Sequence, residues 1–418
     1  MTSAYSISVY LDLRRAKASG KFPVKLRVYD SVTQKQKMYS TQFEFIEKEF
    51  KSIWKTTKPR SEYRQIRLKL QAMENRANEV ASKLNPFSFD QFEKRLYRKK
   101  GDGVNLKYNY EQKIHALRSH DRIGTASNYE LSQKSLIKFS STIKNQDYGQ
   151  LTFYDITPDW LSDYEYFMVN TTNKSLTTVS MYLRALRTLF NDAIAENEIE
   201  RTHYPFGKRK YQVPASRGVK KALSTDQLKI LYNSTPDTQE QQRAKDFWFF
   251  SYACNGINTK DIAQLRNRDI DGDKIYFYRA KTLKTSKANL KPIVVYLNDF
   301  SLNVIEKYKK QSSNSNDFVF SIISEGDTPE QQHKKIKNFN RFLGQHLKKL
   351  CVANDLPKEI SPYWARHSFA TTSIRKGASM ELLQESLGHG NIKTTQNYFA
   401  GFDNSTKKDF ANQIMDFD

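Results

Sequence analysis

Residues 361–400 read SPYWARHSFATTSIRKGASMELLQESLGHGNIKTTQNYFA, and this stretch carries the most informative side chains of the chain. An apolar helical segment follows Arg366, a second amphipathic segment ends at the glycine-containing turn around His389, and Tyr398 comes shortly after. Arginine offers a planar pair of donors, histidine a single donor, and tyrosine a phenolic oxygen that can become covalently attached. The three side chains can therefore converge on one phosphate group.

Composition and charge indicate a polyanionic partner. The chain has 418 residues, and Lys+Arg 68 against Asp+Glu 45 gives a net charge of +23 with a pI near 9.6. This length predicts two or three domains, and the positive field suits nucleic acid. Charge alone also allows a basic, ribosome-associated factor.

The cysteines and the apolar segments indicate the compartment. Cys254 and Cys351 lie far apart in apolar stretches, which is typical of reduced core residues and not of a disulfide frame or a zinc site. The first residues lack the apolar region of a signal peptide, and no apolar window of about eighteen residues occurs. We expect a soluble, cytoplasmic protein that is associated with the nucleoid through DNA.

Three motifs in this order resemble the tyrosine recombinase (phage integrase) family: Arg366-His367-Ser368-Phe369-Ala370-Thr371, then Leu387-Gly388-His389, then Thr394-Thr395 with Tyr398. The chain also resembles the integrases of conjugative transposons of gut anaerobes. The resemblance implies a multidomain α+β fold with a small β-sheet plus helix module that binds arm sites, a helical core-binding domain, and a mainly α catalytic domain with a β-hairpin. We expect these domains at residues 1–100, 104–203 and 221–418, with a linker at 204–220.

The amino-terminal region predicts three strands and a long helix, from period-two alternation and from a charged run with one apolar face. The segments are 6–13, 24–29, 37–45 and 61–84. The run RRAKASGKFPVKLRVY, residues 14–29, resembles the arm-site domain of conjugative-transposon integrases, and a generic β-rich appendage is the alternative. Its candidates for phosphate contacts in a major groove are Arg14, Arg15, Lys17, Lys21, Lys25 and Arg27.

Helical patterns follow the glycine-containing joint at 99–103, over 108–118, 125–141, 158–169 and 175–196. They resemble the SAM-like core-binding domain of the family. Basic side chains around the last helix are the candidates for DNA phosphates: Lys174, Arg184 and Arg187. The linker that follows is basic and contains proline and glycine, which would let two domains clamp a duplex.

Residues 255–265, NGINTKDIAQL, match the family pattern of glycine, apolar, arginine, two residues and an acid, except at one position. Asn258 stands where the family has the first phosphate-clamping arginine. Asparagine donates one neutral hydrogen bond but does not neutralise charge. The resemblance implies that this loss marks the conjugative-transposon branch.

A β-hairpin is predicted over 274–281 and 290–297. Lys281 stands where the family keeps the general acid that protonates the leaving oxygen, and Lys284 and Lys287 are alternatives. In a strand, Arg279 and Lys281 would share a face. We hypothesise that Arg279 supplies the charge missing at Asn258, and a DNA-backbone contact is the alternative.

Tyr363 replaces the histidine of the family's histidine–x–x–arginine motif. A tyrosine there can hydrogen-bond a phosphate or hold the nucleophile, but it is a poor base near neutral pH, and a packing substitution is the alternative. His367 is interpreted as a structural hydrogen-bonding residue. The short helical tail at 404–418 would pack on a neighbouring protomer in the family, and disorder without DNA is the alternative.

The resemblance implies that Tyr398 forms a 3′-phosphotyrosine link while Arg366 and His389 bind the phosphate and Lys281 protonates the leaving oxygen. The implied partners are double-stranded DNA with core and arm sites and a homotetramer that resolves a Holliday junction, and a host DNA-bending protein and an excision factor are further candidates. The chain has no phosphate-binding GxxxxGK[ST] loop and no cysteine/histidine metal spacing, so no cofactor or metal is expected.

The leading interpretation is a site-specific integrase of a mobile element. A DNA invertase that uses the same chemistry, and a catalytically weakened DNA-binding homologue motivated by Asn258 and Tyr363, are the alternatives. DNA relaxation of the type IB topoisomerase kind is a conceivable side reaction.

Overall fold

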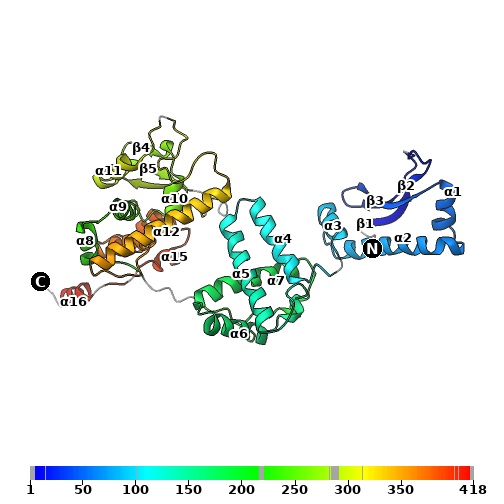
Figure 1. The fold of residues 1–418 in the computed structure, drawn as a ribbon, viewed down its shortest axis with the longest axis horizontal. Helices are drawn as coiled ribbons and strands as arrows, with labels where there is room; N and C mark the ends of the chain where they lie inside the picture. Colours follow the sequence, from blue (N-terminus) through cyan, green and yellow to red (C-terminus); the bar gives the residue numbers. More distant parts are fainter. Residues whose placement is uncertain are drawn as a thin grey trace. The chain divides into compact units, whose positions relative to one another are not determined.

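The computed structural model divides the chain into two compact units, Met1–Leu117 with Thr125–Ala215, and Arg118–Gly124 with Ser216–Asp418 (Figure 1). The residues that it describes are 5–14, 16–99, 101–215, 221–281, 283, 291–312, 314–399, 401–402 and 404–414. The described elements are mainly helical, with two antiparallel three-stranded sheets. The predicted multidomain α+β fold class is confirmed.

The amino-terminal part of the first unit is a sheet of strands β1 (Tyr5–Leu11), β2 (Phe22–Asp30) and β3 (Lys35–Phe45) in that order. Alternate residues of β2, Val24, Leu26 and Val28, are buried, whereas Arg27 points to solvent. One face of the sheet therefore packs on helices, and the other is open. The following helices are α1 (Glu47–Phe50), the π-helical turn η1 (Lys51–Lys55), α2 (Ser61–Ser82) and α3 (Phe89–Leu96).

The rest of the first unit is helical and has an aromatic core. Phe139 lies edge-on to Trp160, with ring centroids 4.8 Å apart, and Phe153 lies edge-on to Phe190 at the same distance. The elements are α4 (Leu106–Ser119), α5 (Ile123–Thr142), η2 (Phe153–Asp155), α6 (Pro158–Tyr166), η3 (Phe167–Thr171), α7 (Leu176–Ala195) and η4 (Arg201–His203). All four helices predicted for this region are present.

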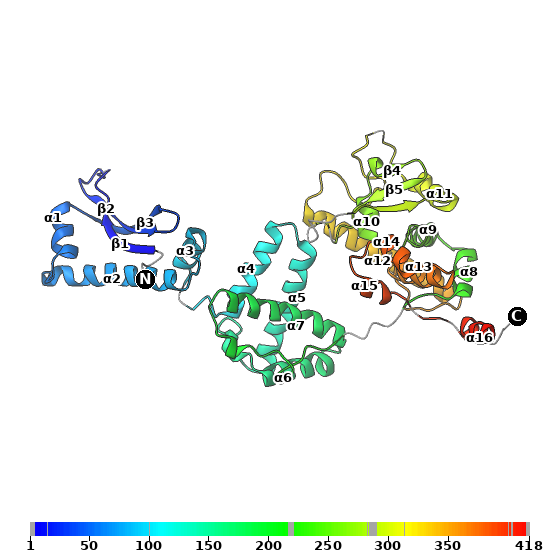
Figure 2. The same cartoon turned by 180° about the vertical axis from the view of Figure 1, so that it is seen from behind.

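The second unit is organised around helix α9 (Gln239–Ala253). Its second half is apolar on all sides, as expected of a central helix, and it contacts α8, α11, α12 and α13 (Figure 2). Trp248, Phe247 and Phe250 are among the largest fully buried side chains. The other elements are α8 (Thr225–Asn233), α10 (Thr259–Gln264), η5 (Asn267–Asp269), β4 (Ile270–Asp271), β5 (Lys274–Phe277), β6 (Ile293–Tyr296), α11 (Asp299–Tyr308), α12 (Pro329–Ala353), α13 (Trp364–Arg375), α14 (Met380–Leu387), α15 (Ile392–Gln396) and α16 (Asn404–Gln413).

Several local predictions about the second unit are tested by these elements. Ser224 caps α8 and Gln227 completes the capping box. The strands of the hairpin are shorter than predicted, because β5 ends at Phe277 and β6 begins at Ile293. Arg279 and Lys281 therefore lie in a turn beyond β5, and the prediction that they share a strand face is wrong.

Two further observations concern burial and hydropathy. Cys254 and Cys351 are free thiols that lie buried in the core of the second unit, as predicted. Burial raises the pKa of both thiols to about 12, so they stay protonated near neutral pH. Within the described ranges, no helix combines the length and the hydropathy needed to cross a bilayer.

Candidate active site

Arg366 lies at the centre of the site, on the first turn of α13, and is 3% exposed. A buried guanidinium requires hydrogen-bond partners: Nη1 donates to the Gly256 carbonyl at 2.8 Å and Nη2 to the Leu387 carbonyl at 2.5 Å. Burial and the neighbouring Arg279 lower the pKa of Arg366 to about 10, which leaves it cationic near neutral pH. Its Nε has no hydrogen-bond partner among the described residues, so one buried N–H remains for a ligand.

Two glycines with positive φ make room for the arginines. At Gly256, where φ is +65°, a Cβ would lie 2.8 Å from the Arg366 Cα. Gly388 ends α14 in the left-handed conformation, and a Cβ there would lie 3.2 Å from the Arg279 Cδ and collide with Ile293. Glycine at both positions therefore lets the backbone approach these side chains closely.

His389 is 8% exposed and links Arg366 to Thr395. Its Nε2 lies 3.1 Å from Arg366 Nη2, and its Nδ1 lies 3.0 Å from the Thr395 hydroxyl. Because Arg366 can only donate, Nε2 is the acceptor and Nδ1 carries the proton. Burial and the cations Arg366, Arg279 and Lys281 lower the pKa of His389 to about 3. The imidazole is therefore neutral in the free protein.

Tyr398 follows α15 and packs into the same pocket. Its ring stacks on His367 at 4.8 Å between centroids and lies 5.0 Å from the His389 ring. The Arg366 guanidinium carbon is 5.4 Å from its centroid. The structure thus brings together Arg366, His389 and Tyr398, as the sequence motifs predicted.

The turn after β5 also reaches the pocket. Arg279 is half-buried, and its Nη1 donates to the Gly388 carbonyl at 3.4 Å. Asp261, from α10, accepts from the Ala280 amide at 2.9 Å and from the Asn258 side chain at 3.3 Å. These contacts hold the turn that bears the exposed Lys281. The alternatives Lys284 and Lys287 lie outside the described residues.

A hollow of about 180 Å³ adjoins Arg366, and Asn258 and Tyr363 line it. Two further lining residues, Lys260 and Asn340, were missed from the sequence. Lys260 stands two positions after Asn258 in the family pattern, and this proximity is a signal that would have identified it. Asn340 lies on α12, and nothing in its sequence context marks it.

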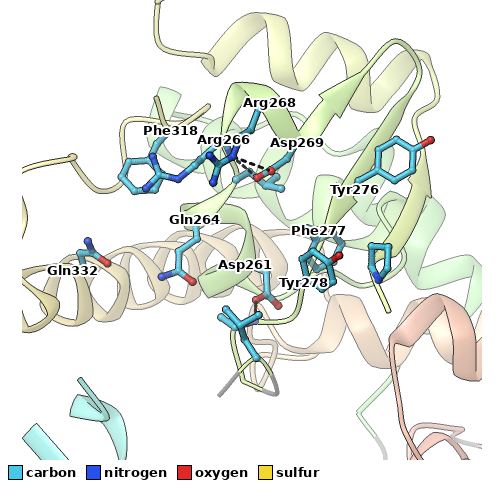
Figure 3. A pocket seen from close by; sticks show the side chains of 14 residues that line it. Asp261, Gln264, Arg266, Arg268, Asp269, Tyr276, Phe277, Tyr278, Phe318 and Gln332 are labelled. Atoms are coloured by element: carbon cyan, nitrogen blue, oxygen red, sulfur yellow. Dashed lines mark hydrogen bonds and ion pairs between the residues drawn. The ribbon is translucent and has the colours of Figure 1, made fainter. Parts of the chain in front are cut away.

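A larger hollow of about 520 Å³ lies beside the hairpin (Figure 3). The Arg266 guanidinium carbon lies 4.1 Å from the Phe318 ring centroid on one wall. Arg268 and Tyr276 line other walls. The hollow therefore combines cationic and aromatic side chains, as do protein surfaces that bind nucleic acid.

The predicted DNA-binding residues of the first unit have different surroundings. Asp12 is nearly buried and forms ion pairs with Arg14 at 2.7 Å and Lys25 at 2.8 Å, so both cations are partly neutralised. Lys17 pairs with Glu44 at 2.6 Å, and the Arg27 guanidinium lies over the Tyr10 ring at 5.2 Å. Lys21 follows the β1–β2 turn, and Arg15 lies outside the described residues. Lys174, Arg184 and Arg187 are exposed.

Comparison with known proteins identifies the family to which the chain belongs. Residues 221–404 match the phage integrase family, and residues 105–213 match the phage integrase SAM-like domain, so the two matches together cover more than half of the chain. The chain belongs to the phage integrase family. The tyrosine recombinase predicted from the sequence is therefore confirmed, and the protein is a site-specific DNA recombinase by family.

Similar relatives in this family are tyrosine recombinases. The chain is 28% identical over 227 residues to a tyrosine recombinase of Thermosipho africanus, covering 53% of this chain and 71% of that protein. It is 27% identical over 226 residues to tyrosine recombinase XerA of Thermococcus kodakarensis, covering 54% and 70%. Among solved structures, the Tn1549 transposon integrase in complex with circular intermediate DNA shares the fold, with a TM-score of 0.51, 17% identity, and coverage of 74% of this chain and 99% of that one.

Proposed function

We propose that this recombinase is the integrase of a mobile genetic element and that Tyr398 is its nucleophile. The observation that carries the proposal is the pocket in which the half-buried Tyr398 packs against the buried side chains of Arg366 and His389. In this reaction the Tyr398 oxygen bonds to the scissile phosphorus as the bond to the 5′ oxygen breaks. The energy of the broken bond is kept in a 3′-phosphotyrosine link. A 5′ hydroxyl of the partner strand then attacks this link and displaces Tyr398, and the first such exchange of strands forms a Holliday junction.

Arg366 and His389 hold the phosphate in this proposal. The Arg366 Nε–H without a protein partner is available to a non-bridging oxygen. The same anion counteracts the cations that lower the pKa of His389, so that Nε2 gains a proton and donates to the phosphate. The Arg366 Nε–H is already fixed beside the developing charge, so it lowers the barrier without further reorganisation.

Arg279 supplies the cation that Asn258 does not. Its contact with the Gly388 carbonyl, and its lowering of the pKa of both Arg366 and His389, support a role inside the phosphate pocket over a distant backbone contact. Lys281 is the general acid for the 5′ oxygen. Its exposure and the Asp261–Ala280 hydrogen bond support a lysine that closes on bound DNA from an anchored turn.

DNA is held by both units in this proposal. Lys25 and Arg27 lie on the open face of the amino-terminal sheet, which suits insertion into the major groove of an arm site. Arg184 and Arg187 lie on one face of α7 and would contact core-site phosphates. The active assembly is a homotetramer on core and arm sites, with a host DNA-bending protein and an excision factor as further partners.

The test uses a nicked suicide duplex that carries the junction of the element. Wild type should form a covalent protein–DNA complex without ATP or added metal, whereas Tyr398→Phe should bind the duplex and form none. Tyr296→Phe is the matched control, because Tyr296 is a 67% exposed tyrosine of the same unit. Binding by wild type to a verified site without a covalent complex would contradict the proposal and indicate a weakened DNA-binding homologue.

A further inference from the structure

The hydroxyl groups of Tyr363 and Tyr398 form a hydrogen bond with each other. Tyr363 immediately precedes α13, and Tyr398 follows α15, so two segments far apart in the sequence meet at these two oxygens. The rings are tilted by 58°, with centroids 6.1 Å apart. The hydroxyl oxygen of Tyr398, which is the reacting atom in the function proposed above, is therefore hydrogen-bonded to a second phenol.

Packing holds this pair of tyrosines in place. His367, one helical turn after Tyr363, lies edge-on to the Tyr363 ring at 5.2 Å and stacks on the Tyr398 ring at 4.8 Å, with 26° between the planes. The Arg366 guanidinium also lies against the Tyr398 ring. The two hydroxyls meet because three rings from two segments pack together, and His367 is the positioning residue of that group.

The surroundings determine which phenol keeps its proton. The titratable and charged groups near the pair are Arg366 and His367 of α13, Arg279 after β5, His389 after α14, and Asp261 of α10. Partial burial and the hydrogen bond to Tyr398 raise the pKa of Tyr363 further than the two arginines lower it. Two phenolates in contact would repel each other strongly. When Tyr398 loses its proton, Tyr363 therefore retains its own.

We propose that Tyr363 is a catalytic residue that donates its hydroxyl hydrogen to the Tyr398 oxygen and stabilises the attacking phenolate. The inference rests on the proposed function, since it assumes that Tyr398 attacks the phosphate. The Tyr398 proton passes to water, which reaches the pair because Tyr363 is 46% exposed. The Tyr398 oxygen–phosphorus bond then forms as the bond to the 5′ oxygen breaks, and Lys281 protonates that oxygen.

The donated hydrogen bond is strongest to the phenolate and weaker to the phosphotyrosine ester, whose bridging oxygen carries little charge. It therefore assists cleavage. It also assists rejoining, because the reverse reaction crosses the same transition state as the phenolate leaves. This role differs from the phosphate contact and from the leaving-group proton, which other side chains supply in the proposed mechanism.

The experiment measures single-turnover cleavage by wild type, Tyr363→Phe and Tyr363→His on two suicide duplexes. One carries the natural phosphate, and the other has sulfur in place of the leaving 5′ oxygen. Loss of a charge-assisted hydrogen bond should slow Tyr363→Phe by about 10- to 100-fold, and Tyr363→His, which keeps a donor, should recover part of the rate. The Tyr363→Phe defect should persist on the sulfur duplex, because a thiolate leaves without a proton, whereas Lys281→Ala should regain rate there.

Equal rates for Tyr363→Phe and wild type on both duplexes would overturn the inference. Slow cleavage by Tyr363→Phe that returns to the wild-type rate on the sulfur duplex would also overturn the inference, because Tyr363 would then assist the leaving group. Electrophoretic mobility shifts and a thermal unfolding midpoint confirm that each variant binds and folds. A covalent complex retained by Tyr398→Phe would instead refute the proposed nucleophile, so the two failures are distinguishable.

Discussion

At the residue scale, the side chains that motif spacing predicted are the ones that share the pocket. Arg366, His389 and Tyr398 were predictable because each stands in a short motif of the family and the three motifs follow in the family's order. Arg279 was predicted by a strand argument that is wrong, yet its side chain reaches the site from a turn. Asn340 could not be predicted, because only the packing of α12 brings it to the pocket.

Removal of the Arg279 guanidinium tests the proposal that Arg279 supplies the positive charge that is missing at Asn258. Arg279→Ala should lower the rate of cleavage by about 10²- to 10³-fold, as expected when one fixed donor to the developing charge is lost, and Arg279→Lys should retain part of that rate. Single-turnover cleavage of the suicide duplex measures this. Arg341→Ala, which removes an exposed arginine of α12 that lines neither hollow, is the control. Cleavage by Arg279→Ala at the wild-type rate would assign Arg279 to the DNA backbone instead.

The lowered pKa of His389 predicts how stability depends on pH. The folded protein holds this imidazole neutral down to about pH 3, whereas an unfolded histidine gains its proton near pH 6.5. The unfolded state therefore binds more protons between these values, and the stability contributed by neutral His389 is lost as the pH falls from about 6.5 towards about 3. His389→Gln does not titrate, so wild type should lose more stability than this variant over that range. Thermal unfolding measured across this pH range compares the two proteins. Unfolding midpoints that fall by the same amount in both proteins would contradict the prediction.

At the element scale, caps and amphipathic stripes were predictable, and boundaries in polar helices were not. Ser224 with Gln227 is a capping-box pattern that marks the start of α8, and the amphipathic α14 ends at the glycine-containing turn before His389, as expected. The start of helix α9 at Gln239 was missed, because its first turns are polar and show no apolar stripe. Helix α12 was not predicted; its Pro329 start and Thr328 cap are recognisable signals in hindsight.

The glycine turns between elements give a structural prediction. Gly256→Ala should lower the free energy of unfolding by more than the 1–3 kcal/mol typical of a strained φ, and should reduce cleavage, because the added methyl displaces Arg366. Gly272 has a φ of +57° with open space around its Cβ position. Gly272→Ala should therefore lower the free energy of unfolding only by the strain of a positive φ. Chemical denaturation and cleavage assays compare the two. Equal behaviour of both variants would show that Arg366 tolerates the methyl group.

At the scale of the whole molecule, the chain combines a sheet module, a helical region and a catalytic unit, each with its own hydrophobic cluster. The order of these parts was predictable because the periodicity changes along the chain, from alternating strands to amphipathic helices. Which basic residues remain free of ion pairs was not predictable, since Lys25 meets Asp12 only because β1 pairs with β2.

Separate cores predict that arm binding and cleavage can be lost independently. Arg27→Glu reverses the charge of an exposed side chain on the open sheet face and should weaken binding to an arm-site duplex, because phosphate repulsion replaces attraction. Cleavage of a core-site suicide duplex should stay within about twofold. Lys69→Glu, on exposed α2 behind the sheet, is the control. Unchanged arm binding, measured by mobility shift at fixed salt, would exclude this face as the arm-binding surface.

The most direct test of the central claim is to locate the covalent bond. The complex trapped on the suicide duplex is digested with trypsin, and the peptide linked to the 3′ phosphate is identified by mass spectrometry. The account predicts the peptide Thr394–Lys407, whose only tyrosine is Tyr398. A link on the peptide Glu359–Arg366, which contains Tyr363, or a link to the 5′ end of the DNA, would contradict it.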